Sequence, residues 1–149
     1  MDTLLIDWGL PALFCVSFLA ATVLPIASEW LLAALVATRQ VDLTAAVAIA
    51  TTGNTLGAIT TWAIGVWGGM WIMRRWLRIS DSDRLRAERW YTRWGSWSLL
   101  LAWLPVVGDP LCLVGGLLKV PLLRFTILVA TGKAARYVVV AWAARQLIA

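Results

Sequence analysis

Long apolar stretches restrict the fold of this chain more than any other feature. They cover residues 10–38, 43–73, 97–118 and 122–149. The chain is 61% hydrophobic, and only 14% of its residues are charged, well below the proportion usual in soluble proteins. The stretches 43–73 and 122–149 are long enough to cross a bilayer, which takes about 20 residues. We therefore expect an all-α polytopic membrane protein.

A proline interrupts each of the other two apolar stretches, and an acid follows it. Pro25 precedes Glu29 in the first stretch, and Pro105 precedes Asp109 in the third. As a helix, residues 10–24 would be about 22 Å long, too short for a hydrocarbon core of about 30 Å. One helix kinked at Pro25 is the alternative, but it would carry a carboxylate near mid-membrane. We expect instead two re-entrant hairpins, each made of two half-helices.

The residues after each proline predict how the second half-helix begins. Ser28 can cap the first one, with Glu29 in its first turn, where the helix dipole favours an acid. In the other hairpin Asp109 can be the N-cap, with Pro110 at the first helical position. Gly108 belongs to the same tip. Both tips would therefore present a helix N-terminus with an acid near mid-membrane.

The two halves of the chain also resemble each other. Aligning the prolines pairs three positions: Pro25 with Pro105, Glu29 with Asp109, and Arg39 with Lys119. One residue of slip then aligns the spanning segments: Gly53 with Gly132, Asn54 with Lys133, and Gly57 with Arg136. A hairpin returns to its own face and a span crosses once, so the second half must start on the opposite face. The sequence thus predicts an inverted repeat, as in many transporters.

We expect one domain over residues 1–149, in which a connector at 74–96 joins repeats at 9–73 and 97–149. Seven arginines between residues 74 and 93 place the connector in the cytoplasm by the positive-inside rule, with both termini on the other side. Residues 80–95 predict an amphipathic helix that attracts anionic lipid. Its apolar face would hold four residues: Ala87, Trp90, Tyr91 and Trp94.

Small residues recur at every fourth position of the stretch 43–73. They form one seam: Gly53, Gly57, Thr61, Gly65 and Gly69. Such a seam commonly allows a second backbone to approach closely. We interpret it as a packing surface, with a half-helix of a hairpin as the candidate neighbour.

Several classes of function are excluded by composition. The chain has no histidine, which removes histidine-ligated metal sites and Ser-His-Asp triads. Cys15 and Cys112 stand alone in apolar runs and predict neither a disulfide framework nor a metal site. No nucleophile and base pair is recognisable, so we expect no enzyme and no cofactor. Basic residues beside hydrophobic spans indicate a membrane face rather than a nucleic-acid partner. The acidic N-terminus predicts no cleavable signal peptide.

Ionisable residues inside the apolar segments are the candidate site. They are Glu29, Asp109, Lys133 and Arg136. A charge inside a membrane is costly and normally faces a partner or a wet cavity. These residues could form a static salt-bridge lock that holds hairpins to helices. The interpretation we favour is a polar cavity at the centre of the repeat that binds substrate and protons.

Several segments resemble the DedA superfamily, also called VTT or SNARE-associated proteins, and within it the YqaA-like branch. The matching segments are LPIASEWLL, GNTLG, YTRWGSWSLLLAWLPVVGDPLCLVGG and GKAARY. The resemblance covers nearly the whole chain. It implies two opposed re-entrant hairpins in the bacterial inner membrane, a role in envelope homeostasis and sensitivity to the proton motive force. For some members it implies translocation of undecaprenyl phosphate or other phospholipids.

The resemblance also implies roles for single residues. Glu29 matches the family's first-hairpin acid, Asp109 stands in the second-hairpin motif, and Arg136 stands where a basic residue recurs in the last helix. The chain departs from larger members where Val66 replaces the arginine of a Gly-Arg pair. It departs again near Trp103, where they carry an arginine before the proline. It also lacks their additional helices, so the resemblance implies the scaffold and leaves the substrate open.

These observations predict a transporter linked to the proton motive force, in the first place a flippase of lipid phosphates. Half-helix N-termini with Lys133 and Arg136 would bind the headgroup, while Glu29 and Asp109 exchange protons. The alternatives are a proton-coupled exporter of small cations or drugs and a non-transporting membrane scaffold. Membrane lipids and protons are the expected partners, and a homodimer is a further candidate because the membrane body is thin.

Overall fold

The computed structural model describes residues 2–21, 27–37, 41–68, 80–104 and 107–146. All regular structure in these ranges is helical. The first half contains α1 (Asp2–Ala20), α2 (Ala27–Ala37) and α3 (Leu43–Trp67). The second half contains α5 (Asp81–Trp94), the 3₁₀ helix η1 (Gly95–Trp103), α6 (Gly108–Leu117) and α7 (Leu122–Gln146). The predicted tip residues Pro25 and Pro105, and Gly69 of the seam, lie outside the described residues.

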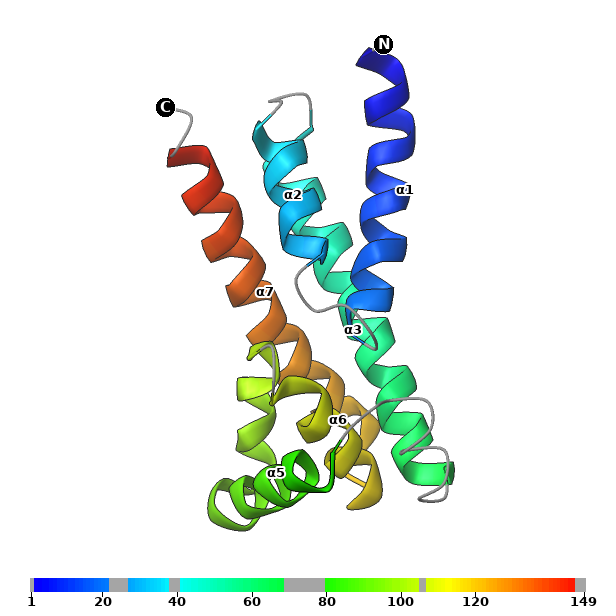
Figure 1. Ribbon diagram of the computed structural model, residues 1–149, viewed down its shortest axis with the longest axis vertical. Helices are drawn as coiled ribbons and strands as arrows, with labels where there is room; N and C mark the ends of the chain where they lie inside the picture. Colours follow the sequence, from blue (N-terminus) through cyan, green and yellow to red (C-terminus); the bar gives the residue numbers. More distant parts are fainter. Residues whose placement is uncertain (1, 22–26, 38–40, 69–79, 105–106, 147–149) are drawn as a thin grey trace.

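The two helical hairpins lie at opposite ends of the molecule (Figure 1). The α1–α2 hairpin is at the end that carries both chain termini, while η1, α6 and α5 are at the other end. The long helices α3 and α7 connect the two ends. The short helices of each half therefore lie toward opposite ends of the long helices.

The long helices α3 and α7 have the length and apolar character that the sequence predicts for spanning segments. Each has 25 residues, or about 38 Å of helix, and is long and apolar enough to cross a membrane. The Asp42 carboxylate caps α3 by accepting a hydrogen bond of 2.8 Å from the Ala45 amide. α3 ends at Trp67, before the predicted limit at residue 73.

Three of the four hairpin helices are short, as predicted from the prolines. α2 has 11 residues and α6 has 10, which correspond to about 16 Å and 15 Å. The nine residues of η1 make about 18 Å of 3₁₀ helix. The prediction is wrong for α1, whose 19 residues reach about 28 Å. Hydropathy misses the extra length because α1 starts at Asp2, ahead of the apolar run, and continues through Pro11.

Each long helix contacts both hairpins. α3 packs against α1 of its own half and against α6 of the other half. In the same way α7 packs against η1 of its own half and α2 of the other half. The two long helices also contact each other. The halves are therefore interlocked and do not form two separate bundles.

The connector helix α5 begins and ends where the sequence predicts. The Ser80 hydroxyl caps it by accepting from the Asp83 amide at 3.2 Å, and Gly95 ends it with φ of 58°. Its predicted apolar face is only partly an outer face, because Ala87 and Tyr91 are buried. Trp94, at the end of the same face, is 61% exposed. We expected this face of α5 to contact lipid, but part of it packs against α6 instead.

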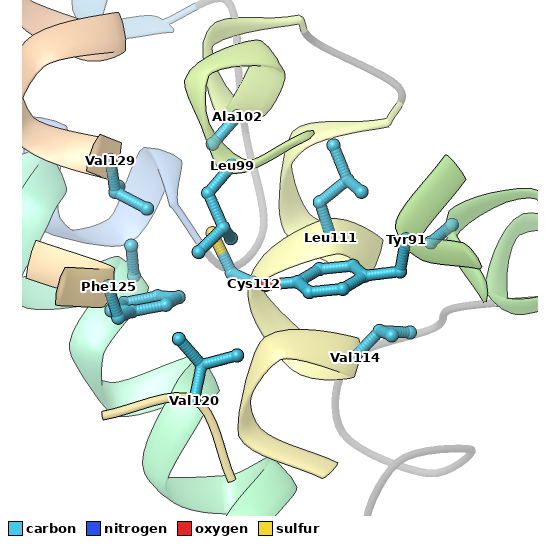
Figure 2. Packing of buried hydrophobic residues seen from close by; sticks show 11 residues of the cluster. Tyr91, Leu99, Ala102, Leu111, Cys112, Val114, Val120, Phe125 and Val129 are labelled. Atoms are coloured by element: carbon cyan, nitrogen blue, oxygen red, sulfur yellow. The ribbon is translucent and has the colours of Figure 1, made fainter. Parts of the chain in front are cut away.

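Buried apolar residues form a separate cluster around each hairpin. Around α6, the ring of Tyr91 and the side chains of Leu111, Cys112, Phe125 and Val129 pack together (Figure 2). A second cluster lies between α1, α2, α3 and α7, and includes Leu13, Leu32, Ala46, Tyr137 and Ala141. Along α7, Lys133 and Arg136 lie between Val129, which belongs to the first cluster, and Tyr137, which belongs to the second.

Candidate functional site

Arg136 joins the two hairpins. Its guanidinium forms an ion pair with Glu29 in the first turn of α2. It also donates a hydrogen bond of 2.6 Å to the carbonyl oxygen of Trp103, the last residue of η1. The side chains of Arg136 and Glu29 are 16% and 24% exposed, so water or a ligand can reach the pair. One cation of α7 thus holds an acid of one hairpin and a backbone oxygen of the other.

Lys133 lies one turn before Arg136 and much deeper. It is 4% exposed, and its ammonium donates to the side-chain oxygen Oδ1 of Asn54 on α3. This is its one hydrogen bond within the described part of the chain. The alignment of the two repeats pairs Asn54 with Lys133, and the structure places these two side chains in direct contact where α3 meets α7.

A neutral polar chain continues from Asn54 to the first hairpin. The Asn54 amide Nδ2 donates to the Tyr137 hydroxyl at 2.6 Å. That hydroxyl lies 3.0 Å from the Ser28 hydroxyl on α2. Asn54, Tyr137 and Ser28 are each at least nine-tenths buried. The chain therefore links α3, α7 and α2 through groups that carry no net charge.

Sequence reasoning did not single out Asn54 or Tyr137 as site residues. One signal for Asn54 was present, since the repeat alignment places it opposite a lysine. It is also an amide in the middle of a long apolar helix, where polar residues commonly hydrogen-bond to a neighbouring helix. Tyr137 gave no such signal, because an aromatic residue in a membrane helix has many ordinary roles.

Asp109 is the one candidate acid without a direct partner among the described residues. It lies in the first turn of α6 and is close enough to Lys133 and Arg136 for their charges to act on its carboxylate. The structure gives it no ion pair and no hydrogen bond within the described ranges. The site thus contains one paired acid, Glu29, and one unpaired acid.

The predicted caps of the short helices are wrong. The residue before α6 is Val107, so Asp109 is the second helical residue and Pro110 the third. Pro110 is tolerated there because the first-turn amides of a helix have no partner within it. Ser28 is likewise inside α2, and its hydroxyl bonds to Tyr137 and not to the helix backbone. A tertiary hydrogen bond has replaced the local cap.

Glycines allow the hairpins to approach the long helices closely. A Cβ on Gly53 or Gly57 would collide with backbone carbonyl oxygens of α1. A Cβ on Gly65 would collide with the carbonyl of Leu113 in α6. On the other long helix, Gly132 stands against the carbonyl of Leu100 in η1. Gly108, at the start of α6, closes the second hairpin against the Ala102 carbonyl.

The remaining reactive side chains are two cysteines and Tyr91, and of these Cys112 is close enough to Lys133 for their charges to interact. Cys15 is exposed on α1 and Cys112 is buried in α6, and neither forms a disulfide. Within the described residues there is no cluster of three potential metal ligands. Burial raises the pKa of the Tyr91 phenol on α5 further above its ordinary value. Its hydroxyl has no hydrogen-bond partner in the described structure.

Comparisons with known proteins place the chain in a family. Residues 24–146 match the family model described as the VTT domain. The chain is 38% identical to inner membrane protein YqaA of Escherichia coli over 135 residues, which cover 91% of this chain and 90% of that protein. It is 37% identical over 133 residues to an uncharacterized protein of Haemophilus influenzae, covering 85% and 81% of the two chains. No solved structure matches it. The chain belongs to the VTT domain family, the DedA family, as its sequence segments indicated.

Proposed function

We propose that this protein is an inner-membrane transporter that moves lipid phosphates across the bilayer, linked to the proton motive force. The observation that carries the proposal is Arg136, which contacts Glu29 of one hairpin and the Trp103 carbonyl of the other. A guanidinium binds phosphate in two-point geometry and more strongly than it binds a neutral carbonyl. A phosphate headgroup would therefore compete with both protein ligands and loosen the contact between the hairpins.

The unpaired carboxylate of Asp109 supports a link to protons. It lies near the charges of Lys133 and Arg136 without bonding directly to either. With both acids ionised, the two acids and two bases of the site cancel. A proton on Asp109 leaves one net positive charge, which favours a bound anion. Loss of that proton on the other side of the membrane would favour release.

A groove beside the polar chain supports a lipid substrate over a small ion. It has a volume of about 490 Å³ and runs between α3 and α7. Its lining is mainly apolar and includes Val47, Val138 and Trp142. Thr51 and Ala134, which also line it, lie one turn or less from Asn54 and Lys133. Acyl chains could therefore stay in an apolar groove while the headgroup occupies the charged centre.

Placement in the membrane follows from the helix lengths. α3 and α7 would cross the bilayer, while the hairpins that enter from opposite ends would be re-entrant and form an inverted repeat. Such hairpins require that any non-helical backbone at membrane depth is buried in protein or lines a cavity. The arginine-rich connector would be cytoplasmic and both termini periplasmic. The relative YqaA is named an inner membrane protein, which supports the location. In this proposal the protein binds lipids and protons and catalyses no reaction. A homodimer would add helices to the small membrane body of one chain.

The second candidate function is a static membrane scaffold. The ion pair between Arg136 and Glu29 favours it, because a pair that holds α7 to α2 is what a structural lock requires. The scaffold needs only the attraction between the two charges, whichever helix carries which sign. Transport needs the cation on α7, near the second hairpin.

A flip assay in proteoliposomes tests the transporter proposal. Fluorescent phosphatidylglycerol is the probe, and the variants are Glu29→Gln, Asp109→Asn and Arg136→Ala. We expect each variant to lower the flip rate by about tenfold or more, which corresponds to about 1.4 kcal/mol of barrier. Unchanged transport in all three would remove the assigned site. Faster transport of a cationic dye in Arg136→Ala, with loss in the carboxylate variants, would favour the cation exporter.

The double variant Glu29→Arg with Arg136→Glu separates the transporter from the scaffold. It keeps the attraction between α2 and α7 but moves the cation away from the Trp103 carbonyl. We expect a folded protein that no longer flips phosphatidylglycerol. Full complementation of a deletion phenotype by this variant, without flip activity, would favour the scaffold.

A further inference from the structure

The buried amine of Lys133 is held by a group that carries no negative charge. Lys133 is almost fully buried, and its ammonium bonds to the amide oxygen of Asn54. A buried ammonium is normally paired with a carboxylate, because an uncompensated charge is costly to desolvate. Glu29 pairs with Arg136, and Asp109 is close enough to Lys133 for their charges to interact but makes no direct contact with it in the described structure.

The Asn54 side chain is fixed in one orientation. Its Nδ2 donates to the Tyr137 hydroxyl, and its Oδ1 accepts from Lys133. Reversing the amide would point an N–H group at an ammonium that has only donors. Tyr137 is anchored in turn by Ser28 on α2. Three buried neutral groups therefore set where the Lys133 ammonium lies.

We infer that Asn54 is a positioning residue that determines the charge class of the transported headgroup, because it fixes the Lys133 ammonium and leaves its positive charge in force. The inference rests on the proposed transport function. Because the group at position 54 is neutral, the positive charge of Lys133 can attract an anion. An acid at position 54 would have nearly the same shape but would cancel the charge of Lys133.

The isosteric variant Asn54→Asp is the direct test. The purified protein is reconstituted into liposomes, and the flip rates of fluorescent phosphatidylglycerol and fluorescent phosphatidylcholine are measured separately. We expect the rate for the anionic phosphatidylglycerol to fall by about tenfold or more. The rate for the zwitterionic phosphatidylcholine should stay unchanged or rise. The melting temperature should stay equal or increase, because the new acid pairs with Lys133.

Two further variants serve as controls. Lys133→Gln removes the same charge while its amide can still donate to Asn54, so it should show the same loss of selectivity even if Asn54→Asp does not fold. Thr92→Asp adds an acid at an exposed position on α5 and should leave the ratio of the two flip rates unchanged. A purely structural role for Asn54 would change both lipid rates together with the melting temperature.

The outcomes separate this inference from the proposed function. If Asn54→Asp and Lys133→Gln flip both lipids at wild-type rates while Arg136→Ala does not, the inference is wrong and the transport proposal stands. If the wild type itself does not flip phosphatidylglycerol, the transport proposal fails and the inference fails with it. Loss of phosphatidylglycerol transport alone, in both variants, supports the role of Asn54.

Discussion

Two buried tyrosines of this protein differ in what their hydroxyl groups do. The Tyr137 hydroxyl accepts from Asn54 and lies within hydrogen-bond distance of Ser28. The Tyr91 hydroxyl is buried between α5 and α6 without a partner in the described structure. A buried polar group costs free energy unless it is hydrogen-bonded, and its removal strands any partner that it had. The same substitution should therefore have opposite consequences at the two positions.

We predict that Tyr137→Phe lowers the free energy of unfolding by about 1–3 kcal/mol, because it leaves the buried amide of Asn54 and the Ser28 hydroxyl unpaired. Tyr91→Phe should leave stability unchanged or raise it. Unfolding in mixed detergent micelles, followed by circular dichroism, measures both. Equal losses in the two variants would show that the hydrogen bonds of Tyr137 add nothing to packing.

Sequence reasoning located the ionisable residues of the candidate site but did not assign their partners. Glu29, Asp109, Lys133 and Arg136 were predictable because ionisable residues stand out in apolar segments. The pairing was not predictable, because it depends on which faces of α2, α3 and α7 turn toward one another. The contact between Ser28 and Tyr137 joins residues that are 109 positions apart, and no local pattern indicates such a contact.

At the scale of the helix, glycines decide how closely the elements pack. The seam of α3 faces the backbone of α1 at Gly53 and Gly57 and the backbone of α6 at Gly65. A backbone carbonyl cannot move aside as the end of a side chain can. The regular spacing predicted a packing seam, but the sequence did not show that it serves both hairpins in succession.

A pair of Gly→Ala variants tests the seam. Gly57→Ala would drive its Cβ into the Phe18 carbonyl and the Ala21 side chain. We predict a loss of about 1–3 kcal/mol, the usual cost of overpacking. Gly9→Ala meets only the flexible end of Leu35 and should be neutral or stabilising, since alanine favours a helix. The melting temperatures of the two purified variants check this, and a stable Gly57→Ala protein would contradict the close approach of α1.

Helix ends were the least predictable features at this scale. The prolines located the short helices, yet hydropathy underestimated α1 and local capping rules misplaced the start of α6. The α5 helix was predicted well because its cap at Ser80 and its terminal Gly95 are local signals.

At the scale of the whole molecule, α5 and the end of α7 lie at opposite ends (Figure 1). If α3 and α7 each cross the membrane, these two ends face different compartments. The native cysteines allow a clean labelling experiment, because Cys112 is buried and only Cys15 is exposed. Substituting Cys15 by alanine gives a background in which one new cysteine can be followed.

We predict that a cysteine replacing Gln146, at the end of α7, reacts with an impermeant maleimide in intact cells. A cysteine replacing Ser82 on α5 should react only after the membrane is permeabilised, because the positive-inside rule predicts that this arginine-rich helix is cytoplasmic. Gel shifts after labelling measure the two reactions. Labelling of both positions from the same side would rule out the proposed crossing of α7.

The contacts between α2 and α7 also set an order of events during synthesis. The ribosome completes α2 long before it reaches the last helix, and domains made early usually fold early. Here Ser28 and Glu29 obtain their partners only when Tyr137 and Arg136 arrive. Until α7 is made, the Ser28 hydroxyl and the Glu29 carboxylate of the first hairpin lack these two partners. The first hairpin made is therefore among the last parts to be completed, and a chain truncated before α7 leaves it unfinished.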